Sequence, residues 1–464
     1  MVGATKIERA VKLESDRVLD LGRLGGEPLQ RRNFVSTYHD TPEALLARCG
    51  ITLRRRLENG RNDWQLKLPA NGHRREVEEP GGAAAPPGSI AALIVAFTHG
   101  RPLVQLARLR TTRDGVLLRA DTGIAEVVND DVAVLDGQKV TQEFREVEIE
   151  LIAGDSRTLE TVERAVTRLG ARRTDGRTTI ARALGLHEQE PKRAKSDAER
   201  IERYFARRYV DLLAADPGVR LGIEAEAVHD LRVAVRRLRS LLGSARATFV
   251  RDWADGMRDE LDWLGSALGP LRDLDVFTAH LSTEAAELVE EDRAQLAPAF
   301  AVLAADHEVA RANALVALSS ERYFALLEML ASPPELVDSK ETLADLAAAQ
   351  LRKVRKLVRR ARDDGSDELL HKARINAKRL RYLAEALGEE RVVRRAKGFQ
   401  DVVGEHQDAV VAEQQLRGLA LRVPGAALPL GVLIERERER RVRMRRDVPK
   451  SWRRLERAAR RAWK

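Results

Sequence analysis

Two stretches of this chain place a histidine ahead of basic residues at matching positions. The first, HDLRVAVRRLRS, begins at His229, and the second, HKARINAKRLRY, begins at His371. Arginine donates paired hydrogen bonds to phosphate oxygens, and lysine supplies a compact positive charge. The repeat therefore indicates a binding site for an anion rich in oxygens, such as a chain of phosphate groups.

The spacing of these residues predicts that each stretch is a helix with a cationic stripe. A residue advances about 100° round a helix, so offsets of 0, 3, 7 and 10 fall within an arc of roughly 80°. Apolar residues such as Leu231 and Leu238 occupy a neighbouring arc and predict the buried side. An ordinary solvated face would explain one copy alone. It does not explain two matching copies, because a solvated face requires no particular residue at a particular offset. The matched pairs are His229/His371, Arg232/Arg374, Arg236/Lys378, Arg237/Arg379 and Arg239/Arg381.

The residues around the two stretches repeat as well. GPLRDLDV, from Gly269, parallels GEHQDAVV, from Gly404, so that Asp273 and Asp408 fall at equivalent positions. From residue 199 onward, apolar residues recur three and four apart, which is the helical period. We therefore expect two homologous helical bundles related by a pseudo-twofold axis, with both cationic stripes lining one groove.

The first 186 residues have a pattern typical of strands. ITLRRRLE and DWQLKLP flank Asn59-Gly60, a strong hairpin signal, and a second Asn-Gly, at Asn71-Gly72, precedes HRREVEEP. Further strands are expected in VLLRADTGIAEVV and EFREVEIELIAG, and a short helix in LETVERAVTRLG. A charged linker is expected at 187–198. The chain is thus predicted to be α+β, with a strand-rich domain at 1–186 and an all-helical domain at 199–464.

Charged residues alternate with apolar ones along the predicted strands. Successive side chains of a strand point to opposite faces, so Arg54 and Arg56 share one face of ITLRRRLE. In REVEIEL, Glu146, Glu148 and Glu150 share a face in the same way. Such faces fit either a solvated antiparallel sheet or a closed tunnel whose charged faces point inward. A tunnel would bind a polyanion together with its divalent cations.

A family resemblance favours the tunnel. ERAVK near the start is followed by YHDTPEALLARCGITLRRR, WQLKLP and REVEIEL. In this order the segments resemble the CYTH family of triphosphate tunnel metalloenzymes, over about residues 5 to 186. The resemblance implies an antiparallel β tunnel or barrel with short helices, in which acids hold metal ions and bases hold a triphosphate. The family's activities include hydrolysis of inorganic triphosphate, thiamine triphosphate and RNA 5′-triphosphate, and adenylate cyclisation.

The family's functional positions carry over to this sequence residue by residue. By this resemblance Glu8, Glu146 and Glu148 are metal ligands for Mg²⁺ or Mn²⁺. The implied catalytic set is Glu8, Lys12, Arg54, Arg56, Lys67, Glu146 and Glu148. Further candidates are Glu76, Arg110, Arg119 and Asp130.

Two positions depart from the family pattern. Ala10 replaces the second glutamate of the family's Glu-x-Glu-x-Lys motif, and Thr179 stands where the family often has a lysine. Two-metal phosphoryl transfer needs both ions placed to activate water and to neutralise the developing charge. The tunnel is therefore expected either to hydrolyse inorganic triphosphate with a divalent metal or to have kept only a binding role.

The helical half has a resemblance of its own. VHDLRVAVRRLRS, HKARINAKRLRY and VVGEHQDAV resemble the CHAD family, the conserved histidine α-helical domain, over about residues 196 to 464. The resemblance implies two four-helix bundles that enclose a basic channel and bind inorganic polyphosphate. The implied polyphosphate-binding residues are His229, Arg232, Arg236, Arg239, Arg272, His371, Arg374, Lys378, Arg379, Arg381 and His406.

Composition restricts the remaining possibilities. The single cysteine, Cys49, cannot form an internal disulfide, which fits a reducing cytoplasm. No apolar run approaches the roughly 18 residues of a membrane span. Aromatic residues make up only 4% of the chain and do not alternate with the arginine stripes, which argues against nucleic acid as the main ligand.

The sequence therefore predicts a cytoplasmic CYTH–CHAD protein that binds inorganic polyphosphate and carries a triphosphate tunnel. Its expected partners are inorganic polyphosphate or triphosphate, and no membrane. One alternative is a non-catalytic protein of polyphosphate granules whose tunnel has degenerated. A second alternative is a helical protein that binds nucleic acid.

Overall fold

The computed structural model describes residues 4–70, 73–120, 122–187, 194–222 and 225–463. The chain divides into two units, residues 1–192 and 193–464. Half of the predicted linker, residues 188–193, lies outside the described residues, and so does the predicted turn at Asn71-Gly72.

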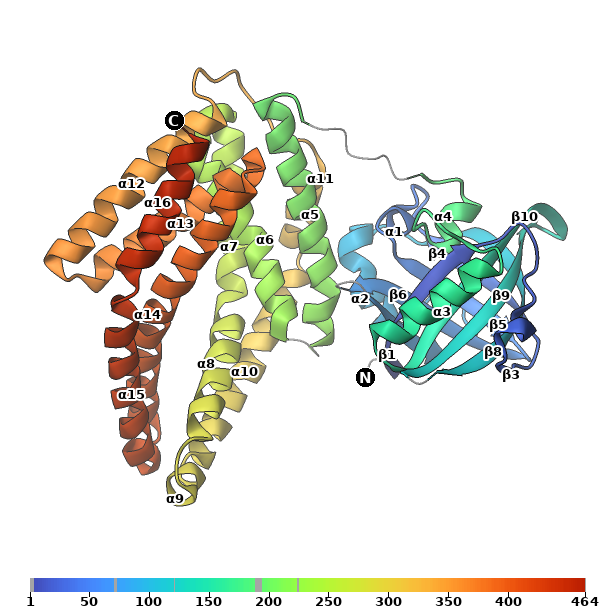
Figure 1. The fold of residues 1–464 in the computed structure, drawn as a ribbon, viewed down its shortest axis with the longest axis horizontal. Coiled ribbons are helices and arrows are strands. Elements are labelled where there is room, and N and C mark those ends of the chain that lie inside the picture. Colours follow the sequence, from blue (N-terminus) through green and yellow to red (C-terminus); the bar gives the residue numbers. More distant parts are fainter. Residues whose placement is uncertain (1–3, 71–72, 121, 188–193, 223–224, 464) are drawn as a thin grey trace. The chain divides into compact units, whose positions relative to one another are not determined.

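Strands dominate the first unit, as predicted (Figure 1). They are β1 (Ala4–Glu8), β2 (Ala10–Glu14), β3 (Glu27–Pro28), β4 (Arg32–Asp40), β5 (Thr52–Glu58), β6 (Arg61–Ala70), β7 (His73–Pro80), β8 (Val104–Ala120), β9 (Gly123–Asp136), β10 (Lys139–Gly154) and β11 (Arg172–Arg173). Their order in the antiparallel sheet is β1-β7-β6-β5-β4-β8-β9-β10-β2-β11, and β3 pairs with β8.

The sheet curls round until its two ends meet. β1 and β2 are separated only by Arg9, yet β1 pairs with β7 and β2 pairs with β10. The carbonyl of Arg9 accepts a hydrogen bond of 2.8 Å from the backbone N–H of Leu151 on β10. One nearly continuous N-terminal segment therefore joins both ends of the sheet and encloses its inner face.

The hairpin predicted at Asn59-Gly60 is confirmed between β5 and β6. Asn59 and Gly60 have φ values of 48° and 78°, the left-handed pair that a tight two-residue hairpin requires. This turn sets the register in which Arg54 lies opposite Gln65 and Arg56 lies opposite Asp63. The turn therefore decides which side chains share the inner face.

The apolar face of the sheet lies outside, beneath short helices. Val147 and Ile149 of β10 are fully buried in a cluster that includes Val162 and Val166 of the predicted helix, α3. α3 begins earlier than predicted because the side chain of Asp155 accepts a hydrogen bond from the backbone of Arg157. The helices of this unit are η1 (Leu21–Leu24), α1 (Leu45–Arg48), α2 (Gly88–Thr98), α3 (Ser156–Arg168) and α4 (Thr179–Ala183).

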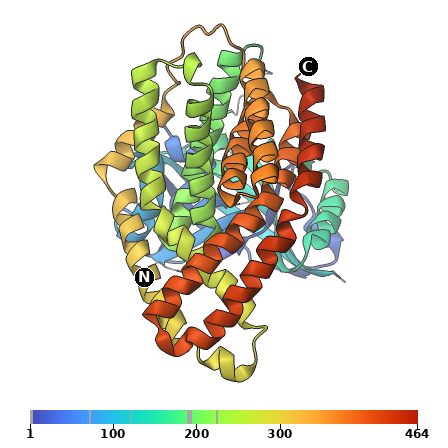
Figure 2. The same cartoon turned by 90° about the vertical axis from the view of Figure 1, so that its left-hand side faces the viewer.

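Helices make up the second unit (Figures 1 and 2). The first half contains α5 (Asp197–Leu221), α6 (Ala225–Ser244), η2 (Arg246–Thr248), α7 (Arg251–Ala267), α8 (Gly269–Ala285), α9 (Glu290–Ala294), α10 (Ala297–Leu318) and α11 (Glu321–Ala331). The second half contains α12 (Leu343–Asp364), α13 (Asp367–Leu387), α14 (Glu390–Arg422), η3 (Pro424–Ala426), α15 (Ala427–Arg445) and α16 (Val448–Ala462). The predicted α+β class and all-helical second half are confirmed, and no helix described is both long and apolar enough to cross a bilayer.

The two halves correspond helix by helix. α6 carries the first histidine–arginine stretch and α13 the second, and these two helices pack against each other. α7 and α8 are separated by a single residue, and together they correspond to the continuous α14. Pro270 follows Gly269 at the start of α8, whereas Glu405 follows Gly404 inside α14. Since proline lacks a backbone N–H, it explains why only the first copy is interrupted.

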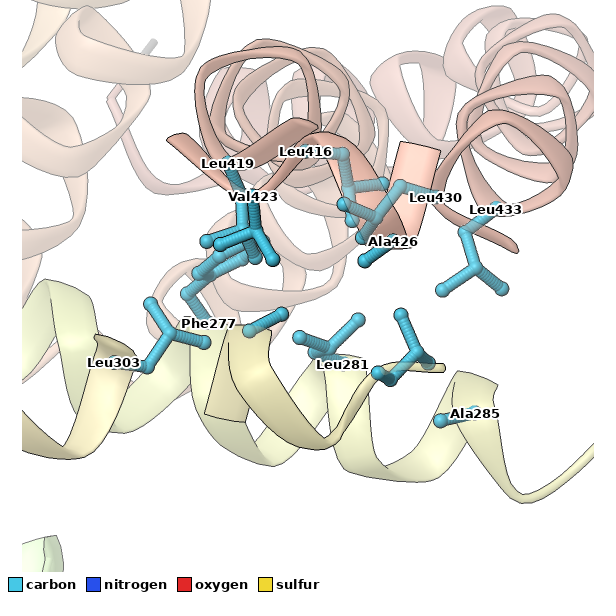
Figure 3. Close-up of a cluster of buried hydrophobic side chains, with 12 residues drawn as sticks. Phe277, Leu281, Ala285, Leu303, Leu416, Leu419, Val423, Ala426, Leu430 and Leu433 are labelled. Carbon is cyan, nitrogen blue, oxygen red and sulfur yellow. The ribbon is translucent and has the colours of Figure 1, made fainter. Parts of the chain in front are cut away.

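A hydrophobic cluster also joins the two halves (Figure 3). Phe277 and Leu281 of α8 lie in the same buried cluster as Leu416 of α14 and Leu430 of α15. Burial of each such side chain contributes about 1.5–3 kcal/mol. The cluster therefore helps to hold the halves together, in addition to the contact between α6 and α13.

Candidate functional site

The curled sheet of the first unit encloses a polar cavity of about 280 Å³. Its lining comes from β1, β2 and β4 to β10, together with Thr179 of α4. The predicted residues that line it are Lys12, Arg54, Arg56, Lys67 and Glu148. The charged faces therefore point inward, and the alternative of a sheet with a solvated charged face is wrong.

Each predicted acid of this tunnel is paired with a base. Lys67 Nζ donates to both carboxylate oxygens of Glu8, at 2.8 and 2.9 Å. Lys12 Nζ donates to Thr179 Oγ1 at 2.8 Å and to Glu146 Oε2 at 3.3 Å. Thr179 Oγ1 in turn donates to Glu146 at 2.7 Å. Thr179, which replaces a family lysine, therefore anchors the Glu146 carboxylate and the Lys12 ammonium.

Arg113 is a central residue of the tunnel that the sequence analysis missed. Its Nη2 donates to Asp130 at 2.6 Å and to Glu148 at 2.9 Å. Burial opposes ionisation of Glu148, but the attraction of Lys12 and Arg113 outweighs it and holds the pKa of Glu148 well below its usual value. Strand alternation in β8, which places Arg113 with the cavity-lining Thr111, was the available signal.

Arg56 is a tunnel cation with an incomplete set of hydrogen bonds. Its Nε and Nη2 are buried without a hydrogen bond, although Nε lies 3.3 Å from Glu58. The guanidinium carbon lies 3.6 Å from the centroid of the Phe34 ring. Burial, together with the nearby charges of Arg54 and Arg113, lowers the pKa of Arg56 to about 10. Buried, incompletely bonded cations that repel one another form a site that an anion would stabilise.

A second cavity of about 370 Å³ shares Lys12, Arg74 and Glu148 with the first. Glu8 and Ala10 also line it, so the position of the missing family glutamate opens directly onto this space. Carboxylate oxygens are the ligands that Mg²⁺ and Mn²⁺ prefer, so the retained acids have the right ligand chemistry for such a cation. Among the described residues, however, the three predicted ligands do not converge on a single point.

The further tunnel candidates divide into two groups. Glu76 and Asp130 line the cavity, as predicted. Arg119 is instead exposed and pairs with Glu27 at 3.2 Å, and Arg110 is exposed on β8. These two arginines do not line the tunnel because one lies near a strand end and the other lies on the outer face.

In the second unit, the two cationic stripes meet where α6 packs on α13. Arg236 Nε on α6 donates to Tyr382 Oη on α13 at 3.2 Å. Burial lowers the pKa of Lys378 to about 7, and the charges of Arg374, Arg236 and Arg381 add to this effect. Arg236 and Lys378, which are equivalent in the repeat, are therefore close enough to repel each other.

Matching contacts support the predicted pseudo-twofold relation. Arg232 lies 3.8 Å from Asp273, and Arg374 lies 3.7 Å from Asp408. Each arginine also passes over a glycine of the repeat. A Cβ at Gly269 would lie 2.9 Å from Arg232 Nη1, and one at Gly404 would lie 3.1 Å from Arg374 Nη2. The repeated glycines therefore give the arginines room.

The structure brings together only some of the residues that were predicted to bind polyphosphate. His229 has its pKa lowered, first by burial and then by Arg272, so these two residues are neighbours. The residues brought together, called the α6–α13 cationic cluster below, are His229, Arg232, Arg236, Arg272, Arg374 and Lys378.

The remaining predicted residues lie elsewhere or have other partners. Arg239 pairs with Asp262 at 2.5 Å. Arg381 pairs with Glu385 at 3.3 Å, although its charge also acts on Lys378 at the edge of the cluster. His371 Nδ1 is buried without a hydrogen bond, and Arg379 is exposed. His406 is only 1% exposed and lies 3.1 Å from Asp367. Among the described residues, no contact connects His406 or Arg379 with the α6–α13 cationic cluster.

The fold and these sites define an α+β protein in which an antiparallel tunnel precedes a helical unit made of two related halves. Residues 4–183 match the CYTH domain and residues 203–417 match the CHAD domain, so the protein belongs to the CYTH–CHAD family. An uncharacterized protein of Mycobacterium tuberculosis is 31% identical to the chain, with 98% of this chain and 96% of that protein covered.

Two solved structures resemble the helical unit. PptA from Streptomyces chartreusis is 23% identical, with a TM-score of 0.45, and the match covers 55% of this chain and 99% of that one. The CHAD domain from the plant Ricinus communis is also 23% identical, with a TM-score of 0.42 and coverage of 59% and 97%.

Proposed function

We propose that this protein binds inorganic polyphosphate at the α6–α13 cationic cluster. The observation that carries the proposal is the closeness of Arg236 and Lys378, which come from equivalent positions of the two halves. A buried lysine surrounded by arginines loses stability in its charged form, and a chain of phosphates would restore it. Polyphosphate offers oxygens along its whole length and no base, which matches a site rich in arginine.

The proposal is tested with the double variant Arg236→Glu with Lys378→Glu in the intact protein. Retention on immobilised polyphosphate is expected to be lost, because two attractive charges become repulsive at the centre of the site. The matched control, Arg251→Glu with Lys397→Glu, changes the net charge equally at side chains that are 81% and 67% exposed. Unchanged retention in the folded double variant, or equal loss in the control, would sink the proposal.

We further propose that the tunnel binds a short phosphate chain such as inorganic triphosphate. The support is the inward-facing set of cations, in which Arg56 lacks hydrogen bonds and Arg54 and Lys67 lie on the same cavity. Lys12 and Lys67 now pair with acids, and phosphate oxygens would take over as their partners. This proposal needs no metal.

Hydrolysis of that triphosphate is the second candidate, supported by the three retained acids, each of which pairs with a base of the tunnel lining. Glu8, Glu146 and Glu148 would hold Mg²⁺ or Mn²⁺, which when bound supplies charge neutralisation and an activated water. Thr179 would keep Glu146 oriented, and Arg113 would do so for Glu148. Lys12 and Lys67 would hold the phosphate chain in place.

The deciding experiment measures phosphate release from inorganic triphosphate by the intact protein with Mg²⁺ or Mn²⁺. Metal-dependent release that Glu148→Gln abolishes would establish a triphosphatase. If phosphate is not released, but Arg54→Gln with Lys67→Gln removes one bound equivalent of triphosphate, the tunnel has only a binding role. Failure of triphosphate to bind at all would contradict both tunnel proposals.

A further inference from the structure

The helical unit brings one histidine and two glutamates together from α8 and α15. His280 and Glu284 lie four residues apart on α8 and so share a face of that helix. Glu437 of α15 lies beside them, and one possible ligand atom from each of the three residues lies within 4.8 Å of the other two. Imidazole nitrogen and carboxylate oxygen are ordinary ligands of divalent transition metals. The three side chains therefore have the chemistry and the closeness of a metal site.

The Glu437 carboxylate is deeply buried and incompletely bonded. Its side chain is only 2% exposed, and its Oε1 lies 2.6 Å from His280 Nε2. Its Oε2 is buried too and, within the described part of the chain, accepts no hydrogen bond, although Arg440 Nη1 lies 3.7 Å away. A buried carboxylate oxygen without a hydrogen bond is rare and costly. Glu437 therefore has room in its bonding for a further positive partner.

The hydrophobic cluster that joins the two halves holds these residues in place. Ala285 of α8 and Leu433 of α15 lie toward the same end of that cluster (Figure 3). Glu284 directly precedes Ala285, and Glu437 follows Leu433 by about one helical turn. The backbones that carry the glutamates are thus positioned by buried packing, which lowers the cost of arranging ligands round an ion.

Two arginines lie near the glutamates and must be accommodated when a cation binds. Arg436 Nη1 lies 3.7 Å from Glu284 Oε2, as Arg440 Nη1 does from Glu437 Oε2. Both distances are too long for hydrogen bonds. The arginine side chains are 37% and 28% exposed, so each has solvent to turn toward.

We propose that His280, Glu284 and Glu437 bind a divalent transition-metal ion such as Zn²⁺, which fastens α8 of the first half to α15 of the second. His280 supplies a ring nitrogen, each glutamate supplies a carboxylate oxygen, and water completes a four-coordinate shell. Bonds of about 2.0–2.1 Å place tetrahedral ligands roughly 3.4 Å apart, so side-chain shifts of about 1 Å suffice. By the spacing that relates Gly269 to Gly404, the counterpart of His280 is Gln415, so this site is not duplicated in the repeat.

The test is a calorimetric titration of the intact, metal-free protein with Zn²⁺ in a phosphate-free buffer. Glu284→Gln should weaken the binding of one Zn²⁺ equivalent at least about tenfold, because one of three ligands is lost. This variant keeps the buried pair of His280 and Glu437, so without metal it should melt at the same temperature as the original protein. Equal Zn²⁺ affinity and stoichiometry in the two proteins would overturn the proposal.

Two control variants separate this site from other metal ligands of the chain. His307 also pairs with an acid of α8, Asp275, at 2.9 Å, but among the described residues this pair has no third ligand. His307→Gln should therefore retain the Zn²⁺ equivalent, and so should Glu148→Gln, which alters the tunnel. If Glu148→Gln removes the only equivalent that binds, the ion lies in the tunnel and the proposal fails.

A second measurement reports on direct contact with the imidazole and on the joining of the halves. Co²⁺ in place of Zn²⁺ should give a visible absorption band that His280→Gln abolishes. Zn²⁺ at a hundred times its Kd should raise the melting temperature of the original protein by about 5 °C, and that of Glu284→Gln by less. A Co²⁺ spectrum that is the same in His280→Gln and in the original protein would show that the ion does not touch this histidine.

Discussion

At the scale of single residues, the charged groups of the two proposed phosphate sites differ in how well they are paired. Arg113 has two carboxylate partners, and although burial opposes it, their attraction raises its pKa. Lys378 has mainly arginines around it, and burial among them lowers its pKa to about 7. Arg113 therefore holds its two carboxylate partners in place. Lys378 is expected to carry a stable charge only when an anion is bound.

Polyphosphate binding at Lys378 should therefore take up a proton. In the free protein near pH 8, Lys378 is mostly neutral, because the pH lies above its pKa of about 7. Bound phosphate raises that pKa, so the lysine becomes charged on binding, and affinity should fall as pH rises from 7 to 9. Calorimetry in two buffers of different ionisation enthalpy measures the proton number directly.

Lys378→Arg is the control for this prediction, because arginine stays charged throughout that range. The variant should still bind, and its affinity should change much less between pH 7 and 9. Equal proton uptake in the variant and in the original protein would show that another group titrates.

A second prediction at this scale concerns Ala10, which lines the cavity shared with Glu8 and Glu148. Ala10→Glu adds a hard oxygen ligand where the family has one, and should raise metal-dependent phosphate release at least about tenfold. Ala84→Glu, which adds the same charge to an exposed loop residue, should leave the rate unchanged. A folded Ala10→Glu protein no faster than the original would mean that the missing carboxylate does not limit the chemistry.

At the scale of elements, the repeat preserves contacts even where it does not preserve helix continuity. α14 is one helix of 33 residues, whereas its counterpart is divided into α7 and α8 at Leu268. Gly269 and Gly404 nevertheless occupy equivalent places under Arg232 and Arg374. The feature that both copies keep is thus the space beneath each arginine.

Gly404→Ala should separate stability from binding. Replacing a glycine inside a helix by alanine stabilises it by about 1 kcal/mol, which should raise the melting temperature by a few degrees. The new methyl group would lie 3.1 Å from Arg374 Nη2, so the guanidinium must move and polyphosphate affinity should fall. Gly418→Ala in the same helix meets no atom within 4 Å. It should stabilise the protein equally without weakening binding, and equal affinities for the two variants would contradict the assigned role of Arg374.

At the scale of the whole molecule, each of the two units, which differ in fold, gathers buried cations close together. The net charge of +9 is modest for 464 residues, so the sites arise from where charge is concentrated. In the tunnel, acids accompany the bases. In the α6–α13 cationic cluster, bases predominate, which fits the proposed binding of polyphosphate.

The two proposed functions should therefore be separable by mutation in the intact chain. Glu148→Gln should abolish any metal-dependent phosphate release and leave retention on immobilised polyphosphate unchanged. Arg236→Glu with Lys378→Glu should have the opposite effect. In the original protein, retention should also weaken steeply as salt rises, because each phosphate contact releases counterions. Loss of both functions in either variant would show that one site serves both.

The sequence by itself determined the features that depend only on a few neighbouring residues. Period-two alternation and Asn59-Gly60 predicted the hairpin and the shared face of Arg54 and Arg56. The repeated histidine–arginine stretches predicted two related halves that pack together. These succeed because turn geometry and helix or strand period are properties of a few neighbouring residues.

Only the tertiary structure decided which groups meet across elements. Arg113 joins Asp130 and Glu148 because three strands are in a particular register, and Tyr204 meets Arg237 because α5 packs on α6. His406 lies in the second repeated stretch, where Leu271 is its counterpart in the first, and it is buried against Asp367. Such neighbours are set by packing between segments that are far apart in the chain. A short-range sequence pattern therefore cannot predict which side chain lacks a hydrogen-bond partner in the folded protein.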